Sequence, residues 1–75
     1  MTTDQFRETL HQVPFRPFTI RMADGRSFDV AHRDFVAQSP SGRTAIVFQS
    51  DEGYSVLDLL LMLELQVSAG NGHLA

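Results

Sequence analysis

The chain has 75 residues, a net charge of −3 and no cysteine. Its length is that of one small domain, and the lack of cysteine excludes a disulfide framework and a cysteine-based metal site. An acidic chain has no overall attraction for nucleic acid or for an anionic membrane. The six basic residues are all arginines and are spread along the sequence, at Arg7, Arg16, Arg21, Arg26, Arg33 and Arg43.

The amino-terminal segment is predicted to form a short helix over about residues 4–12. Thr2 and Gln5 have the spacing of a capping box. Apolar residues then recur on one helical face, at Phe6, Leu10 and Val13. Pro14 ends the helix, because proline disfavours the α conformation at the residue before it. A helix this short must pack against another element to be stable.

A β-hairpin is predicted in residues 18–31. Apolar and polar residues alternate over residues 18–22, which is typical of a half-buried strand. The Asp24-Gly25 pair that follows is a strong hairpin-turn signal. The chain returns over residues 27–31, again with alternate residues apolar, so both strands are expected to turn one face to a core.

Two more strands are predicted at residues 35–38 and 44–49. They are separated by residues 39–43, which are rich in the serine, proline and glycine of turns. The second of these strands is apolar on both faces, with Ile46 and Phe48 on one and Ala45 and Val47 on the other. This pattern predicts a central strand that is covered on both sides.

Residues 54–67 (YSVLDLLLMLELQV) are the densest apolar run in the chain. Apolar residues occupy every odd position from Leu57 to Val67, so a strand would place them all on one side. A helix is the alternative, because Leu, Met and Glu are good helix formers. No capping box precedes the run, and the strand is the preferred interpretation. A run of this length predicts a break or sharp bend near residues 60–62.

The chain is therefore expected to form a single mainly β domain over residues 1–67, with one amino-terminal helix. Four to five strands over residues 18–67 are expected to form a small, strongly bent antiparallel barrel of the SH3-like or Sm-like kind. Residues 68–75 are expected to be a flexible tail. The sequence has no signal-peptide pattern and no apolar run long enough to span a bilayer, so a cytoplasmic protein without membrane contact is expected.

The order of one helix followed by bent strands resembles the Sm-like family, the Hfq type in particular. Local similarities lie at residues 33–36 (RDFV) and 54–56 (YSV). The resemblance implies ring assembly, in which the fourth strand of one subunit pairs with the fifth strand of the next. It also implies RNA binding. Uridine recognition in that family uses a Tyr-Lys-His segment, however, and the lysine and histidine are missing after Tyr54.

A second resemblance is carried by three short segments. Residues 14–18 (PFRPF), 24–26 (DGR) and 39–43 (SPSGR) are similar to segments of small uncharacterised bacterial proteins. This resemblance implies no particular activity.

No catalytic, metal or cofactor site is predicted. His32 and Asp34, with Asp29 nearby, are too few for a metal site, which needs three or four converging ligands. A neighbouring turn carries three hydroxyl side chains, Ser39, Ser41 and Thr44. A nucleophile among them would need an adjacent base and an oxyanion pocket, and His32 is the one candidate base. The protein is expected not to be an enzyme.

Two arginines could contact an anion. Arg26 and Arg43 each follow a turn glycine, and together they could present two guanidinium groups to phosphate or carboxylate. They are the basis of the alternative hypothesis, an Sm-like RNA-binding module.

The preferred hypothesis is a non-enzymatic interaction domain that contacts a second copy of itself or another protein. Leu60 and Met62 form an apolar island on the otherwise polar side of the carboxy-terminal run. Such an island is covered either by the helix or by another chain. Self-association through the carboxy-terminal strands is therefore expected. The predicted interface residues are Tyr54, Asp58, Leu60, Met62 and Glu64.

Overall fold

The structure of the chain is a computed structural model in which residues 1–68 are described. These residues form one helix, six strands and two short 3-10 turns. In chain order they are α1 (Thr3–Leu10), β1 (Phe18–Met22), β2 (Ser27–Val30), η1 (Arg33–Phe35), β3 (Val36–Gln38), β4 (Thr44–Phe48), β5 (Tyr54–Asp58), η2 (Leu59–Leu61) and β6 (Met62–Val67). The expectation of a mainly β chain with one amino-terminal helix is confirmed. Apart from Ser68, the expected flexible tail of residues 68–75 lies outside the described residues.

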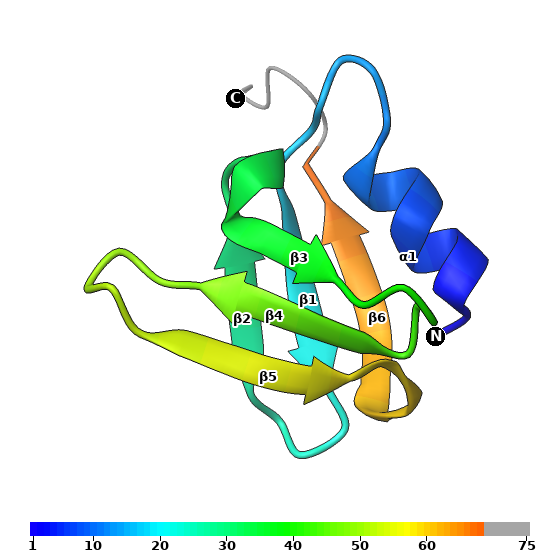
Figure 1. Cartoon of the computed structure of the whole chain (residues 1–75), viewed down its shortest axis with the longest axis vertical. Helices are drawn as coiled ribbons and strands as arrows, with labels where there is room; N and C mark the ends of the chain where they lie inside the picture. Colours follow the sequence, from blue (N-terminus) through cyan, green and yellow to red (C-terminus); the bar gives the residue numbers. More distant parts are fainter. Residues whose placement is uncertain (69–75) are drawn as a thin grey trace.

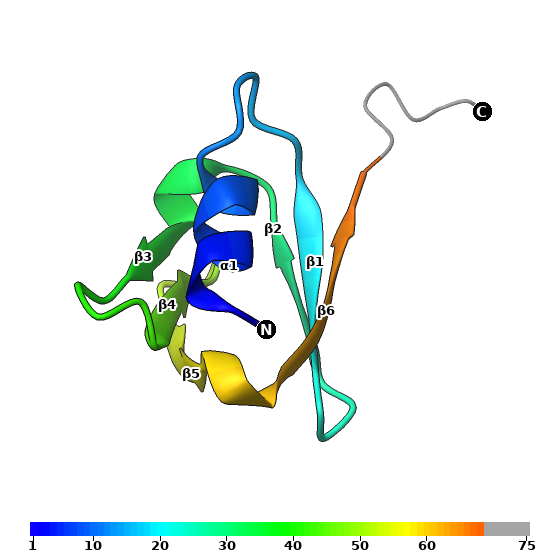
Figure 2. The same ribbon diagram turned by 90° about the vertical axis from the view of Figure 1, so that its right-hand side faces the viewer.

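The strands pair into two antiparallel sheets of three, with the orders β2-β1-β6 and β3-β4-β5 (Figure 1). Figure 2 shows the two sheets facing each other, with α1 lying across the open side between them. The chain crosses between the sheets at η1 and again at η2. The sequence predicted four to five strands where the structure has six, because η2 divides the carboxy-terminal run in two. Strand pairing within residues 1–68 does not confirm a closed barrel.

The core fills the space between the sheets and is completed by α1. Phe6 of α1 is fully buried, and its ring meets that of Phe18 edge to face with 6.3 Å between centroids. An edge-to-face pair of this kind adds to the free energy gained by burying the two rings. The buried apolar side chains are Phe6, Leu10, Phe18, Ile20, Met22, Val30, Val36, Ala45, Val47, Leu57, Leu59 and Met62.

The start of α1 follows the sequence prediction and its end does not. The Gln5 N–H donates to Thr2 Oγ1 at 3.0 Å and the Thr2 N–H donates to Gln5 Oε1 at 3.3 Å, so the capping box is confirmed. The helix ends at Leu10, before the expected residue 12, and Val13 is 91% exposed outside it. The apolar face of α1 is therefore limited to Phe6 and Leu10.

Arg33 holds the carboxy-terminal end of α1. Its Nε donates to the Leu10 carbonyl at 2.9 Å and its Nη2 donates to the Gln12 carbonyl at 2.7 Å. The guanidinium also lies over the Phe15 ring, with 5.4 Å between Cζ and the ring centroid. The last carbonyls of a helix lack partners within the helix, and a cation near them is favourable. The half-buried Arg33 thus ties α1 to the η1 turn.

The predicted hairpin is confirmed. β1 occupies the expected residues, and β2 is one residue shorter than expected. The two strands pair from Phe18 opposite Val30 to Arg21 opposite Ser27. Gly25 has a φ of +93° in the turn between them, a backbone conformation that glycine adopts without steric cost.

The carboxy-terminal run is extended, as preferred, and is interrupted at η2, one residue before the expected position. The odd positions were expected to lie on one side of the strand, but the side chains of the run do not alternate in this way. Leu57 and Leu59 are buried, but Leu61 and Leu63 are exposed and Met62 is buried in their place. Two irregularities change the alternation: the η2 turn itself, and a β-bulge where Met22 pairs with Met62 while Arg21 pairs with Glu64. Leu63 is the extra residue of this bulge.

β4 is the central strand of its sheet, as predicted, but only one of its faces is covered. Ala45 and Val47 are buried in the core. On the other face Ile46 is half-buried and Phe48 is 44% exposed. The expectation of cover on both sides was wrong because no described segment lies over the outer face of this sheet (Figure 2).

The packing of α1 on the β3–β4 turn can be tested at two glycines with positive φ. A Cβ at Gly42 (φ +83°) would lie 2.9 Å from Thr3 Cβ, whereas a Cβ at Gly25 would meet nothing within 4 Å. Gly25→Ala is expected to lower the free energy of unfolding by about 1 kcal/mol through backbone strain alone. Gly42→Ala adds overpacking and should lower it by roughly 3 kcal/mol. Urea denaturation measures both; equal losses would contradict this contact.

The role of Arg33 predicts a second stability difference. Arg33→Ala removes two charge-assisted hydrogen bonds to α1 and should lower the free energy of unfolding by about 2 kcal/mol. Arg16 is exposed, so Arg16→Ala serves as the control and should change stability by less than about 0.5 kcal/mol. Thermal unfolding followed by circular dichroism measures both variants. A loss no larger than that of the control would show that Arg33 does not hold the helix.

Candidate interaction surface

The outer face of the β2-β1-β6 sheet is polar, and its side chains bind one another. Thr19 Oγ1 donates to Asp29 at 2.9 Å, across the β1–β2 pair. Arg21 donates to Gln66 and lies 3.3 Å from a Glu64 carboxylate oxygen, both on β6. These pairs are exposed, and exposed ion pairs contribute little to stability. The face therefore satisfies its own hydrogen bonds in contact with solvent.

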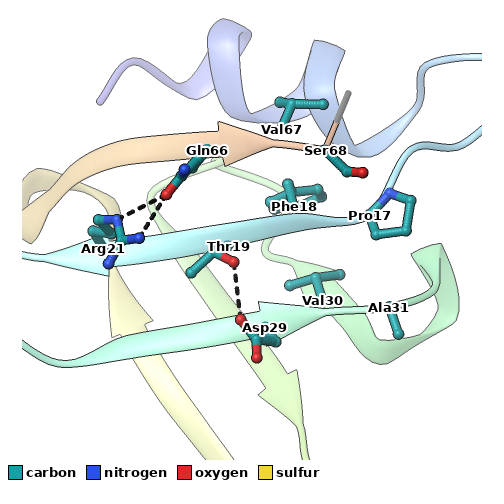
Figure 3. Close-up of a pocket in the computed structure, with 10 residues that line it drawn as sticks. All are labelled: Pro17, Phe18, Thr19, Arg21, Asp29, Val30, Ala31, Gln66, Val67 and Ser68. Atoms are coloured by element: carbon teal, nitrogen blue, oxygen red, sulfur yellow. Dashed lines mark hydrogen bonds between the residues drawn. The ribbon is translucent and has the colours of Figure 1, made fainter. Parts of the chain in front are cut away.

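A hollow of about 640 Å³ lies at this face near the ends of β1, β2 and β6 (Figure 3). It is lined by Pro17, Phe18, Thr19, Arg21, Asp29, Val30, Ala31, Gln66, Val67 and Ser68. In Figure 3, Arg21 points to Gln66 and Thr19 points to Asp29. Because its polar groups are already engaged with each other, the hollow offers no convergent set of free groups for a small ligand.

A second hollow, of about 610 Å³, lies between α1 and β3 and has three basic residues in its wall: Arg7, His11 and Arg33. The Arg33 guanidinium is already bound to the carbonyls at the end of α1. Arg7 lies 3.4 Å from Asp4, and Asp34 adds a negative charge to the wall. These charges partly offset one another, so the hollow is not a strong anion site.

The outer face of the β3-β4-β5 sheet is apolar, in contrast to the other sheet. We call this surface the apolar face and define it as Ala37, Ile46, Phe48, Tyr54 and Val56. Strand register places these side chains together, with Ile46 opposite both Ala37 and Val56, and Phe48 opposite Tyr54. The Phe48 and Tyr54 rings lie 6.1 Å apart. Cross-strand aromatic and β-branched pairs stabilise the sheet itself, but they leave most of these side chains in water.

The exposure of the apolar face is large for so small a chain. Tyr54 is 63% exposed, Val56 61% and Phe48 44%. Single exposed apolar residues are common, whereas large contiguous groups of them are a feature of interaction surfaces. This surface was not predicted from the sequence, because the apolar pattern on both sides of β4 indicated that Ile46 and Phe48 lie on a covered face. The alternation of Tyr54 and Val56 on the neighbouring strand is the signal that could have revealed it.

β5 lies at the edge of its sheet and presents unpaired backbone groups. The Gln49 N–H donates to the Gly53 carbonyl at 2.8 Å and the Leu59 N–H donates to the Arg43 carbonyl at 3.0 Å, on either side of the β4–β5 ladder. In an antiparallel ladder alternate residues direct their N–H and C=O groups to the partner strand. Ser55 and Leu57 therefore bond to β4. The residues that direct these groups to the free edge are Tyr54, Val56 and Asp58.

β6 is likewise an edge strand, of the other sheet. The Ser68 N–H donates to the Pro17 carbonyl at 2.9 Å. Because alternate residues of an antiparallel strand bond to the same neighbour, Leu65 and Val67 direct their backbone groups away from β1. Three leucines lie exposed where the chain enters this strand: Leu60 (65%), Leu61 (54%) and Leu63 (70%). Free strand edges template pairing with another strand unless they are protected.

The five predicted interface residues have different surroundings. Tyr54 and Leu60 are exposed, whereas Met62 is 2% exposed. Met62 therefore belongs to the core of its own chain and is not on the surface. Asp58 accepts from the Leu60 N–H at 2.9 Å and caps η2. Glu64 lies on the polar face beside Arg21.

The two predicted anion-binding arginines lie on turns that are both joined to η2. The Leu61 carbonyl accepts from the Ala23 N–H at 2.7 Å in the turn that precedes Arg26, and the Arg43 carbonyl accepts from the Leu59 N–H. Arg26 is engaged locally: its Nε donates to Asp24 at 2.8 Å and its guanidinium lies over the Phe28 ring. The Arg26 backbone N–H and guanidinium lower the pKa of Asp24, so this pair stays charged. Arg43 is exposed.

The other candidate groups remain apart. The His32 ring meets Phe35 edge to face at 5.4 Å, and Asp29 is bonded to Thr19. Ser39 and Ser41 bond to each other and to the backbone of their own turn. Within residues 1–68 no three His, Cys, Asp or Glu side chains lie close enough together to hold a metal ion. In the same residues no helix is long and apolar enough to cross a membrane.

Comparisons of the chain with protein families, curated proteins and solved structures find no match.

Proposed function

We propose that the protein is a non-enzymatic interaction domain that self-associates through the strands on either side of η2. The observation that carries the proposal is that the two strands on either side of η2, β5 and β6, each lie at an edge of a different sheet. Each edge presents N–H and C=O groups that bond to no other strand of the chain, and such an edge can pair with a strand of another chain. The edge of β5 on one copy can supply the partners that the edge of β6 on another copy lacks.

The surroundings of the two edges favour association over solvation. Exposed Leu60, Leu61 and Leu63 lie along the chain between the edges and would lose contact with water in such an assembly. Natural edges are often blocked by lysine, proline or inward-pointing charges. β5 carries none of these at Tyr54–Leu57, and β6 has a single bulge, at Leu63, as its protection.

Pairing of β5 of one copy with β6 of another joins unlike surfaces, so β6 of the first copy and β5 of the second remain free to pair again. Contacts of this type close into rings when the rotation per copy allows it. The arrangement agrees with the Sm-like resemblance, in which consecutive late strands pair between subunits. We propose on this basis that the two facing sheets correspond to a small, open Sm-like barrel, with β5 and β6 as its association strands.

The proposal predicts that a proline at Val56 lowers the mass of the protein in solution. The Val56 N–H faces the free edge, so Val56→Pro removes a donor needed for pairing between copies without removing one from the β4–β5 ladder. Val56→Thr keeps the backbone N–H, so it is the matched control and should keep the wild-type mass. Multi-angle light scattering at several concentrations measures both variants.

Two outcomes would contradict this self-association. A wild-type chain that remains a monomer at high concentration would remove it altogether. An equal loss of mass in Val56→Thr and Val56→Pro would assign the contact to the side chain instead of the strand edge. Ser55→Pro checks the assignment of the ladder, because it removes a bond to β4 and should destabilise the fold.

The alternative function is an Sm-like RNA-binding module that uses Arg26 and Arg43. The observation that favours it is that the turns carrying both arginines are bonded to the same short segment, η2. The local ion pair of Arg26 with Asp24 and the overall charge of −3 weigh against it. A ring could still gather several copies of Arg43 into one positive surface, which is the kind of cluster that RNA requires.

The RNA alternative predicts retention of mixed-sequence RNA in a filter-binding assay at low salt, with affinity falling as salt rises. Arg43→Ala should weaken retention severalfold. Arg21→Ala is the control, since Arg21 lies on the polar face beside Glu64. An absence of retention at low salt would exclude the alternative and leave self-association unaffected.

A further inference from the structure

The apolar face is a second surface, separate from the strand edges, and its surroundings are acidic. Asp51 and Glu52 lie in the turn before β5, and Asp58 ends the strand. All three are exposed. Among residues 1–68 none of these carboxylates lies within 4.0 Å of a cationic group, because the ion pairs there involve Asp4, Glu64 and Asp24. The face is therefore an apolar surface with acidic side chains at both ends of β5, of which Asp51 and Asp58 accept backbone hydrogen bonds from Gly53 and Leu60 but make no ion pair within residues 1–68.

We propose that the apolar face binds a cationic amphipathic helix of another protein, with apolar residues on one side and lysine or arginine flanking them. The apolar side would cover Phe48, Tyr54 and Val56. The flanking cations would lie near Asp51, Glu52 and Asp58. The proposal does not depend on self-association, since it uses side chains of the sheet face and none of the backbone groups of the edges.

A helix fits this surface better than an extended segment does. The face of a sheet offers side chains but no backbone partners, because backbone bonds lie within the plane of the sheet. An occupant must therefore satisfy its own N–H and C=O groups, and a helix does so internally. Helix on sheet is also one of the standard ways in which an apolar sheet face is covered.

Charge excludes the other obvious occupants. A second copy docked face to face would bring its own Asp51, Glu52 and Asp58 to the same surface, and like charges at an interface are costly. The exposed leucines near η2 of another copy are flanked by Asp58 and Glu64, so they would carry the same penalty. An anionic membrane or an RNA would be repelled for the same reason. A cationic partner removes the repulsion.

The size of the face sets the length of the probe. A five-residue strand such as β5 spans about 17 Å, which a helix covers with about 12 residues. A suitable probe is a synthetic peptide of about 14 residues with leucines on one helical face and lysines on the other. A matched peptide with glutamates in place of the lysines tests the role of charge. Fluorescence anisotropy of the labelled peptide measures binding to the full chain.

The proposal predicts binding of the leucine–lysine peptide and weaker binding of the leucine–glutamate peptide. The double variant Phe48→Thr, Val56→Thr should weaken binding of the first peptide by about tenfold or more, because it removes apolar contact area from the centre of the face. Val13→Thr removes a still more exposed apolar side chain elsewhere in the chain and should change nothing. Asp51→Asn with Glu52→Gln should weaken binding severalfold and reduce its dependence on salt.

Several results would overturn the proposal. These are no binding of the leucine–lysine peptide, equal binding of both peptides, or equal binding by the double variant and Val13→Thr when circular dichroism shows both to be folded. A fall in solution mass of the double variant would assign the face to a second copy. Failure of self-association is distinguishable, because a monomeric Val56→Pro variant should still bind the peptide through the remaining aromatic residues.

Discussion

The short turn η2 is the constraint on which the arrangement of both sheets depends. Leu59 anchors it in the core at 1% exposure, and Asp58 caps it by accepting from the Leu60 N–H. Backbone bonds join it to both sheets, from the Leu59 N–H to the Arg43 carbonyl and from the Ala23 N–H to the Leu61 carbonyl. The buried Leu59, which is followed by the outward-facing Leu60 and Leu61, is thus held in a single orientation. Because of this turn, β5 and β6 end on different sheets, each with a free edge.

The two sheets meet solvent in opposite ways. Side chains on the outside of β2-β1-β6 bind one another, as Arg21 does with Gln66 and Glu64. Those on the outside of β3-β4-β5 have few polar partners and remain exposed. Both sheets contribute buried residues to a shared core, so stability alone does not require this difference. The proposed contacts of the second sheet with other molecules would account for the asymmetry.

Local sequence signals predicted the features that depend on neighbouring residues. The capping box at Thr2 and the Asp24-Gly25 hairpin follow from spacing alone, and the structure has both. The bond from Arg33 to the Leu10 carbonyl joins residues 23 positions apart, so no local pattern reveals it. The η2 turn was located only approximately, because three leucines carry no glycine or proline signal and Asp58 is its one polar marker. The apolar face was missed because an apolar pattern on both sides of β4 is also typical of a fully covered strand.

The bulge at Leu63 limits how far another strand can pair along the edge of β6. An extra residue bends an edge and increases its local twist, so a flat partner cannot follow it along its whole length. Beyond the bulge, only Leu65 and Val67 present regularly spaced backbone groups on that side. Addition to this edge is therefore limited to a short stretch, which disfavours the flat, continuous strand stacking of a fibril.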